Sequence, residues 1–222
     1  RVIVKPSDLS PACGQLLHEM CKATFDEDQV SVVNGGLGLA RHFPTLTWDH
    51  LVYTGSGTVG RQVMLAAAAN LVPVTLELGG KCPAVVAPDS VLDERTIATV
   101  AGVKVIKRGQ MCVTVDHCLV PESGVKAFTD KLAAHMSANF AQHNAAPHAC
   151  GIISERHLVR LNQLVDEAKA SGAQVIQIGA DLKAGQRDMP FYLVVNPRDD
   201  LALMRQEIFG PILPIKTYRD TA

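Results

Sequence analysis

The sequence predicts an α/β fold in two parts, in which the strands of parallel sheets alternate with helices. Short β-rich runs alternate with helical patterns along all 222 residues, and one glycine pair, Gly79-Gly80, interrupts the alternation. The composition is that of an ordinary globular chain, with 47% hydrophobic and 19% charged residues. Consecutive βαβ units place helices on the faces of a parallel sheet. We therefore expect one domain over residues 1–79 and a second over residues 80–222.

The first part contains four β-rich runs separated by helix and turn signals. Pro6-Ser7-Asp8 supplies a turn and a cap after the first run, and Asn34-Gly35-Gly36 turns the chain after the second. The alternation then continues to the glycine pair. The expected strands are 2–4, 30–33, 50–54 and 74–78, and the expected helices are 11–23, a short one after residue 36, and one that opens within 55–60.

The second part continues the same alternation to its last residues. A polar, proline-containing loop is expected over 142–148. No internal repeat or low-complexity tract is present. The expected strands are 84–87, 117–120, 174–178, 193–195 and 212–215, and the expected helices are 91–107, 122–140, 155–170 and 201–206.

Charge and hydropathy argue against two classes of partner. The formal net charge is −1, and the Lys and Arg residues are scattered, which argues against nucleic acid as a partner. No apolar run reaches the roughly 18 residues that a membrane-spanning helix requires, and we expect no signal peptide, because the first residues are those of a strand. The six cysteines show neither CxxC pairs nor zinc-type spacing, so no metal site is expected. We expect a cytoplasmic protein with reduced thiols.

Residues 55–60, Gly-Ser-Gly-Thr-Val-Gly, fit the G-x-G-x-x-G pattern of a strand-to-helix turn that binds a dinucleotide. The amides and dipole of such a helix start favour a phosphate; the alternative is a plain glycine-rich turn. The acid that follows, Glu77, stands inside the apolar run 74–78, where burial would disfavour its charged form. That property suits a general base near neutral pH. The alternative is a structural carboxylate paired with a cation such as Lys81.

The chain contains five short motifs in a fixed order: Val4-Lys5-Pro6-Ser7-Asp8, Thr54-Gly55-Ser56, Leu76-Glu77-Leu78-Gly79-Gly80-Lys81, Gly109-Gln110-Met111-Cys112 and Glu207-Ile208-Phe209-Gly210-Pro211. In order and spacing they resemble the signature motifs of the aldehyde dehydrogenase family. The pair E-L-G-G-K and G-Q-x-C is specific, whereas a lone cysteine or a G-x-G-x-x-G turn is not. The resemblance covers essentially the whole chain and is greatest to the coniferyl-aldehyde and class 3 branch.

The resemblance implies a Rossmann-like NAD(P)-binding domain over 1–79 and an α/β catalytic domain over 80–222, both partial. It also implies that Cys112 attacks the aldehyde carbon to give a thiohemiacetal. Hydride transfer to the nicotinamide leaves a thioester that water hydrolyses, and Glu77 activates Cys112, the water, or both. A free thiol with a pKa near 8.5 is only about 3% thiolate at pH 7, so such a base has a physical purpose.

The resemblance also implies where the cofactor is held. Lys5 and Asp8 match the positions at the adenosine ribose. Ser56, with the helix-start amides from Gly55 to Gly60, matches the pyrophosphate site. An acid at position 8 would repel a 2′-phosphate, which favours NAD and leaves NADP open. Taken singly, Lys5 has the plainer interpretation of a strand-end lysine, and Asp8 that of a helix cap.

Two residues near the end of the chain complete the expected cofactor site. Glu207 matches the residue on the nicotinamide ribose, and Phe209 the residue against the nicotinamide. Taken singly, Glu207 could pair locally and Phe209 could be core. Cys112 alone would be a buried thiol.

The chain departs from the family pattern just before the cysteine motif. The family carries Asn and a small residue there, whereas this sequence has Lys107-Arg108. Two cations that faced Cys112 would favour its thiolate; facing solvent, they would have no effect. The A-P-D-Y stretch of the branch is replaced by Thr114-Val115-Asp116-His117, which puts the local loop geometry in question.

The chain begins and stops on strand-like segments, which would leave unpaired sheet edges, so we expect it to be part of a longer protein. The family's oxyanion-hole asparagine and C-terminal third lie outside it, and we expect the isolated chain to be inactive. The resemblance implies an aldehyde substrate, either aromatic, such as coniferyl aldehyde, or medium-chain aliphatic, and a homodimer of the full-length protein. Two alternatives remain open: a CoA-acylating enzyme, against which Glu77 argues, and a non-catalytic remnant that acts as a binding module.

Overall fold

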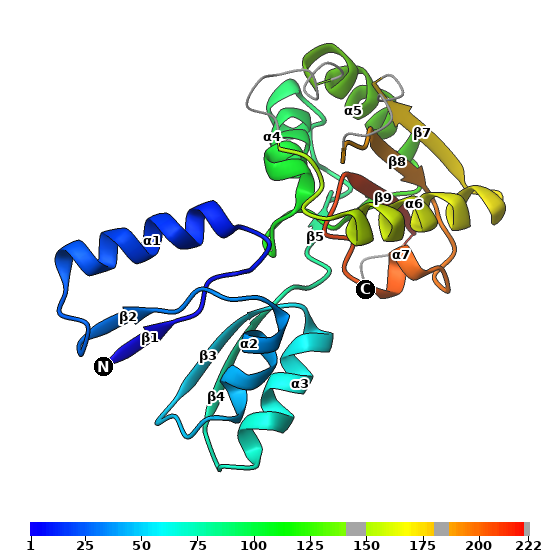
Figure 1. Cartoon of the computed structure of the whole chain (residues 1–222). Coiled ribbons are helices and arrows are strands. Elements are labelled where there is room, and N and C mark those ends of the chain that lie inside the picture. Colours follow the sequence, from blue (N-terminus) through cyan, green and yellow to red (C-terminus); the bar gives the residue numbers. More distant parts are fainter. Residues whose placement is uncertain (141–149, 180–186, 220–222) are drawn as a thin grey trace. The chain divides into compact units, whose positions relative to one another are not determined.

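The computed structural model describes residues 1–140, 150–179 and 187–219, so the loop expected over 142–148 lies outside the described residues. The chain divides into two compact units, Arg1–Leu78 and Gly79–Ala222. Each unit is described by itself, and both appear in Figure 1. The roles of the two units in cofactor binding and catalysis stay predictions.

The first unit contains two separate parallel strand pairs. In the first pair, β1 (Val2–Val4) lies parallel to β2 (Val30–Val32). The connecting helix α1 (Pro11–Thr24) has proline at its start, where the fixed φ and missing N–H of proline are tolerated. The short helix α2 (Leu37–His42) follows, and a 3-10 turn, η1 (Phe43–Thr45), leads to the second pair.

The second pair repeats the βαβ arrangement with a small core. β3 (Leu51–Gly55) lies parallel to β4 (Val74–Leu78), and helix α3 (Gly57–Ala68) connects them. The apolar cluster beneath α3 consists of Leu51, Val63, Ala67 and Val72.

The second unit is built on a five-stranded sheet. Among the described residues, four neighbouring strands run parallel, and the edge strand β7 is antiparallel to its neighbour. The order is β5-β6-β9-β8-β7, with β5 (Pro83–Val85), β6 (His117–Pro121), β9 (Ile212–Tyr218), β8 (Phe191–Val195) and β7 (Gln174–Ile178).

Helices cover both faces of this sheet. Helices α4 (Glu94–Val105) and α5 (Val125–Phe140) contribute to one apolar cluster, and α6 (Glu155–Ala170) contributes to the other. A 3-10 turn, η2 (Ile106–Gly109), follows α4, and the short helix α7 (Ala202–Arg205) precedes β9.

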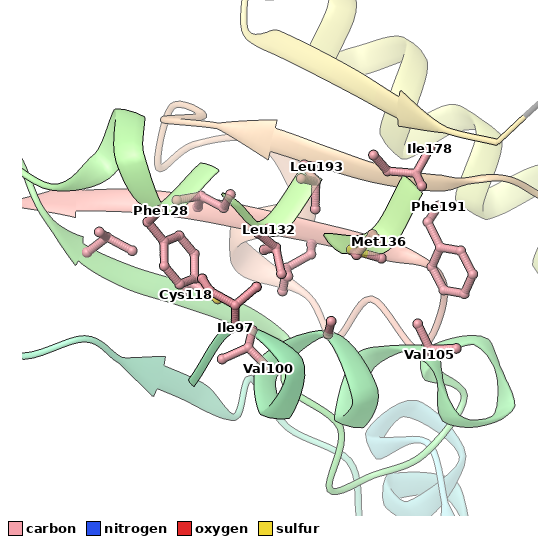
Figure 2. Packing of buried hydrophobic residues seen from close by; sticks show 14 of the residues in the cluster. Ile97, Val100, Val105, Cys118, Phe128, Leu132, Met136, Ile178, Phe191 and Leu193 are labelled. Atoms are coloured by element: carbon pink, nitrogen blue, oxygen red, sulfur yellow. The ribbon is translucent and has the colours of Figure 1, made fainter. Parts of the chain in front are cut away.

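Strand β8 shows why both faces must be covered. Leu193 belongs to the cluster with α4 and α5, whereas Tyr192 and Val194 belong to the cluster with α6. Successive side chains of a strand point to opposite faces of the sheet. Figure 2 shows the first cluster, in which Phe128 and Leu132 lie with Leu193. The second unit is therefore a three-layer α/β domain.

The predicted fold class is confirmed, with boundary shifts at several elements. The helix expected over 91–107 begins at Glu94, because Asp93 caps it by accepting a hydrogen bond from the Thr96 N–H (2.8 Å). The helix expected over 122–140 begins at Val125. Within the described ranges, no helix is both long and apolar enough to cross a membrane.

Candidate functional site

Cys112 follows a tight turn at the end of α4. Three consecutive residues in this turn have positive φ: Lys107 (49°), Arg108 (56°) and Gly109 (71°). Left-handed backbone costs a non-glycine residue roughly 1–2 kcal/mol, so surrounding contacts must hold the turn. The side chain of Cys112 is exposed beyond it.

The glycine of the G-Q-x-C motif lies against a second motif. A Cβ at Gly109 would approach the carbonyl oxygen of Gly210 to 2.4 Å. A Cβ at Gly210 would in turn approach the Leu161 side chain to 2.4 Å. The cysteine loop and the Glu207–Pro211 motif are therefore packed backbone to backbone, at a distance that only glycine permits.

The glutamine of the same motif fixes the loop from another side. Gln110 Nε2 donates to the carbonyl oxygen of Gly151 (3.1 Å), and its Oε1 accepts from the backbone N–H of Ile153 (2.9 Å). One side chain thus bonds two backbone groups of the segment that precedes α6. This pairing leaves Gln110 little freedom to change rotamer.

The two cations before the motif lie in different surroundings. Lys107 is exposed, as the solvent-facing alternative expected, but Arg108 is buried, with 1% of its side chain exposed. The Nη2 atom of Arg108 lies 2.8 Å from Asp188 Oδ1, and its Nη1 donates to the Met189 carbonyl oxygen at 3.4 Å. Arg108 therefore points into the unit and stabilises the strained turn from beneath.

Asp116 is the centre of a polar network that joins three motif segments. Its Oδ2 forms an ion pair with Lys81, and its Oδ1 accepts from the backbone N–H of Ile208 (2.9 Å). Lys81 Nζ also donates to the carbonyl oxygens of Leu203 (2.8 Å) and Gln206 (3.1 Å). These bonds connect the E-L-G-G-K segment, the cysteine loop and the Glu207 segment.

The surrounding network sets the protonation state of Asp116, whose side chain is only 1% exposed. Burial raises the pKa of this carboxyl, but three neighbours lower it: His117, the Ile208 N–H and the Lys81 ammonium. The His117 Nδ1 lies 3.8 Å from Oδ2, too far for a hydrogen bond. The balance leaves the pKa of Asp116 below its usual value, so it is ionised at neutral pH.

A second buried cation lies beneath the cysteine loop. Lys104 in α4 is fully buried, and its Nζ donates to the carbonyl oxygen of Val115 (3.0 Å). Burial lowers the pKa of Lys104 to about 8, although the charge of Asp116 acts in the opposite direction. Val115 offers a neutral carbonyl and not a counter-ion, and burying a charge without an ion-pair partner is unfavourable, so the lysine releases its proton more easily than an exposed one.

Glu207 lies on the backbone of the glycine pair. A Cβ at Gly79 would come within 2.0 Å of both Glu207 carboxylate oxygens, whereas a Cβ at Gly80 would meet nothing within 4 Å. Burial and the charge of Asp116 raise the pKa of Glu207, while a hydrogen bond from the Gly80 N–H, Arg160 and Lys81 lower it. The net effect is a raised pKa.

Arg160 in α6 fixes the backbone of the same segment. Its Nη1 and Nη2 donate to the carbonyl oxygens of Glu207 (3.3 Å) and Ile208 (2.5 Å). Phe209 follows with a positive φ of 47° and a half-buried ring. Of the predicted site residues, the second unit therefore contains Cys112, Glu207 and Phe209, on segments that contact one another.

The predicted pyrophosphate turn belongs to the first unit. Ser56 caps α3, and its Oγ accepts from the Val59 N–H at 3.4 Å. A Cβ at Gly60 would approach Leu78 to 2.8 Å, which explains glycine where a helix packs closely on a strand. The space around Gly57 is open. Beside the turn, the Tyr53 side chain lies against Gly55, so a Cβ at position 55 would overlap with the Tyr53 hydroxyl oxygen.

Three further predicted residues also belong to the first unit. Lys5 Nζ donates to the carbonyl oxygen of Pro6 (2.7 Å), and Asp8 is exposed. The expected burial of Glu77 is wrong, because its side chain is exposed at the end of β4. Alternation along the two-stranded sheet turns it away from the apolar face. The cation that the sequence offered as its partner, Lys81, pairs with Asp116.

Sequence reasoning missed the positioning residues. Lys81 was considered only as a partner of Glu77, and Asp116 only as part of a departure from the branch pattern. A signal was present, because a lysine and an aspartate stand just before two neighbouring strands of one sheet, β5 and β6. Across the described parts of the chain, no group of three or more His, Cys, Asp or Glu residues could hold a metal ion.

Comparison with known proteins agrees with this arrangement. The family model described as the aldehyde dehydrogenase family matches residues 1–222. A probable coniferyl aldehyde dehydrogenase of Caulobacter vibrioides is 40% identical over 99% of this chain and 46% of its own length. Aldehyde dehydrogenase family 3 member F1 of Arabidopsis thaliana is 34% identical over 99% of the chain and 46% of its own length.

A solved structure gives the same result. The NAD-dependent aldehyde dehydrogenase from Sinorhizobium meliloti superposes with a TM-score of 0.87 at 27% identity, covering 99% of this chain and 44% of that one. The chain thus spans less than half the length of these relatives. The motifs, the α/β units and the match over residues 1–222 place it in one class: the chain belongs to the aldehyde dehydrogenase family.

Proposed function

We propose that the whole protein oxidises an aldehyde to a carboxylic acid with a nicotinamide cofactor, and that Cys112 is the nucleophile. The observation that carries this proposal is the exposed Cys112 on a loop held by Gln110, the Gly109–Gly210 contact and Asp116. A nucleophile needs both exposure and a fixed position relative to its substrate. The coniferyl aldehyde dehydrogenase relative suggests an aromatic aldehyde.

The cofactor residues fit a dinucleotide. The capped start of α3 has open space at Gly57, where a phosphate could approach the backbone amides. Lys5 and Asp8 would hold the adenosine ribose, and Glu207, with Phe209 beside it, the nicotinamide ribose. When bound, the cofactor supplies a hydride acceptor. The acid at Asp8 favours NAD over NADP, because its charge would repel a 2′-phosphate.

The residues of this chain then have distinct tasks. The Cys112 thiolate attacks the aldehyde carbon, and the resulting thiohemiacetal loses a hydride to become a thioester. Water releases the acid, and Glu77 takes the proton from that water, from Cys112, or from both. The exposed position of Glu77 supports the water role, because an exposed side chain is accessible to solvent water.

The central test is NADH formation by the whole protein with coniferyl aldehyde. Cys112→Ala should lower the rate by several orders of magnitude, because it removes the nucleophile. Cys150→Ala is the matched control, an exposed cysteine of the same unit that should leave the rate unchanged. Equal rates in the wild type and Cys112→Ala would rule out the mechanism. The acid as product, with coenzyme A present, would exclude the acylating alternative.

Glu77→Gln separates its two possible tasks. If Glu77 activates water, the variant should release one equivalent of NADH in a burst and then turn over slowly. If Glu77 activates Cys112, the burst itself should be slow. An unchanged steady-state rate would remove Glu77 from the mechanism.

A further inference from the structure

A second thiol lies on the backbone of the nucleophile. The Sγ of Cys82 lies 3.5 Å from the carbonyl oxygen of Cys112, as a weak hydrogen-bond donor. Cys82 is partly exposed and Cys112 is exposed. No motif or cofactor contact described above gives Cys82 a role.

The two segments are held side by side by independent bonds. The carbonyl oxygen of Cys82 accepts from the Asp116 N–H (2.9 Å), and Lys81 pairs with the Asp116 side chain. The next residues continue this contact, because Pro83 lies opposite His117 in the parallel pairing of β5 and β6. The backbone of Cys82 is therefore fixed beside the segment that follows Cys112 by bonds that do not involve either sulfur.

The intervening loop leaves room for the sulfurs to meet. Cys112 and Val113 are exposed, within a turn closed by the Thr114 N–H donating to the Met111 carbonyl oxygen (3.2 Å). A disulfide joins two sulfurs about 2.05 Å apart, and the Cys82 sulfur already lies 3.5 Å from the backbone of Cys112. Rotation of the exposed Cys112 side chain about its Cα–Cβ bond then moves its sulfur relative to that of Cys82. The buried Cys118 differs, because burial raises the pKa of its thiol to about 12, so it is inert.

We propose that Cys82 and Cys112 form a reversible disulfide when the protein meets a peroxide. The Cys112 thiolate attacks one oxygen of hydrogen peroxide, the O–O bond breaks, and Cys112 becomes a sulfenic acid as hydroxide leaves. The Cys82 sulfur then attacks the Cys112 sulfur, the S–O bond breaks, and the departing hydroxide takes the Cys82 proton to form water. Two thiols and one peroxide give one disulfide and two waters.

Such a bond would protect the nucleophile. Without a resolving thiol, a sulfenic acid is oxidised further to sulfinic and sulfonic acids, which thiols do not reduce. The disulfide stops oxidation at a step that a thiol reductant reverses. The pairing itself rests on geometry alone; its effect on activity rests on the proposed function of Cys112.

Peptide mapping of the whole protein tests the pairing without any activity measurement. Trypsin places Cys82 in the peptide 82–95 and Cys112 in the peptide 109–126, which also holds Cys118. After brief hydrogen peroxide treatment and alkylation of free thiols, the two peptides should appear joined, with loss of two hydrogens. Fragment ions should place the bond at Cys112. A free Cys112, an over-oxidised Cys112 beside a free Cys82, or a bond to another cysteine would overturn the proposal.

Activity recovery tests the protective role. After peroxide, the wild type should lose aldehyde oxidation and regain it with dithiothreitol. Cys82→Ser should lose activity irreversibly, and the Cys150→Ser control should recover as the wild type does. Recovery of Cys82→Ser equal to the wild type would overturn the protective role. If the mapped disulfide forms but the untreated protein oxidises no aldehyde, the proposed function fails and the pairing stands.

Discussion

The two units differ in where they keep their charged side chains. In the first unit, Arg1–Leu78, every charged side chain is at least partly exposed, and the core is the small apolar cluster beneath α3. The second unit buries Lys104, Arg108 and Asp116 beneath or beside the cysteine loop. Both units have the same βαβ pattern, so the fold does not demand this burial.

The difference in buried charge follows from the task proposed for the loops of each unit. A helix start binds a phosphate through backbone amides, which need no buried charge. A nucleophile on a loop must be held in one position, and buried ion pairs with fixed partners favour one arrangement over others. The charged network in the second unit therefore marks the loop whose geometry matters most.

The largest effect is expected for Asp116→Asn. Removing one partner of a buried ion pair leaves Lys81 without a counter-ion and should lower the free energy of unfolding by about 3–5 kcal/mol. Chemical denaturation of the whole protein measures this loss. Asp130→Asn is the control, because its pair with Lys126 is exposed and should change stability little. Equal losses in both variants would contradict the comparison.

The stability lost in Asp116→Asn should depend on pH. The pKa of Asp116 is lowered in the folded state, so its contribution is fully present above the unfolded pKa of about 3.9 and is lost as the pH falls through the folded value. The stability difference between wild type and Asp116→Asn should therefore shrink on acidification below about pH 4. A difference that grows on acidification would show that the ion pair is not its source.

Lys104→Met should raise the free energy of unfolding, whereas Asp116→Asn lowers it. The folded pKa of about 8, against 10.5, means that the unfolded state binds the proton more tightly. Burial of Lys104 therefore costs about 3 kcal/mol below pH 8, and this cost disappears as the pH rises towards 10.5. After loss of the bond to Val115, the net gain should be about 2 kcal/mol at neutral pH.

Unfolding measured at pH 7 and pH 10 checks this prediction. The gain from Lys104→Met should shrink at the higher pH, whereas the exposed-site control Lys126→Met should show no such trend. If Lys104→Met lowers the free energy of unfolding at both pH values, the contacts of the buried amine stabilise the loop by more than the desolvation of the amine costs.

Gly79→Ala should weaken cofactor binding with little effect on stability. The new Cβ would displace the Glu207 carboxylate, with which it would overlap at 2.0 Å. If Glu207 holds the nicotinamide ribose, the Kd for NAD should rise about tenfold, which corresponds to about 1.4 kcal/mol. Gly80→Ala has open space at its Cβ and is the control. An equal Kd for NAD in the two variants would show that Glu207 does not hold the cofactor.

The smallest expected effect is that of removing a helix N-cap, and the loss of stability should be equal in the two units. Ser56 caps α3 and Ser154 caps α6, each accepting a backbone N–H at 3.4 Å. Replacing either by alanine should cost about 1 kcal/mol of unfolding free energy. A cap is local and does not depend on the surrounding core. Clearly different losses would show that the two units differ in more than their buried charge.

Sequence reasoning predicted the elements well where the pattern was periodic. The helix 155–170 and the strands 74–78 and 174–178 were predicted with their observed bounds, because apolar periodicity and caps agree there. The end of the helix expected over 91–107 was wrong. Nothing in Lys107 or Arg108 signals a positive φ, since tertiary contacts impose it.

The site was predicted at the level of motifs and not of contacts. Cys112 and Glu207 were chosen from their motifs, and both lie on contacting segments of the second unit. The exposure of Glu77 was missed, because an apolar run alone does not distinguish a strand covered on both faces from one covered on a single face. The burial of Arg108 was missed because its partner, Asp188, is remote in sequence.

The bonds that assemble the cysteine loop also have a consequence for folding kinetics. They join residues 92 (Asp116 to Ile208), 122 (Lys81 to Leu203) and 125 (Lys81 to Gln206) positions apart. Closing such long loops carries an entropic cost that local helices and the turn before Cys112 do not. The cysteine loop should therefore reach its final position only after residues 203–208 have arrived beside Lys81 and Asp116.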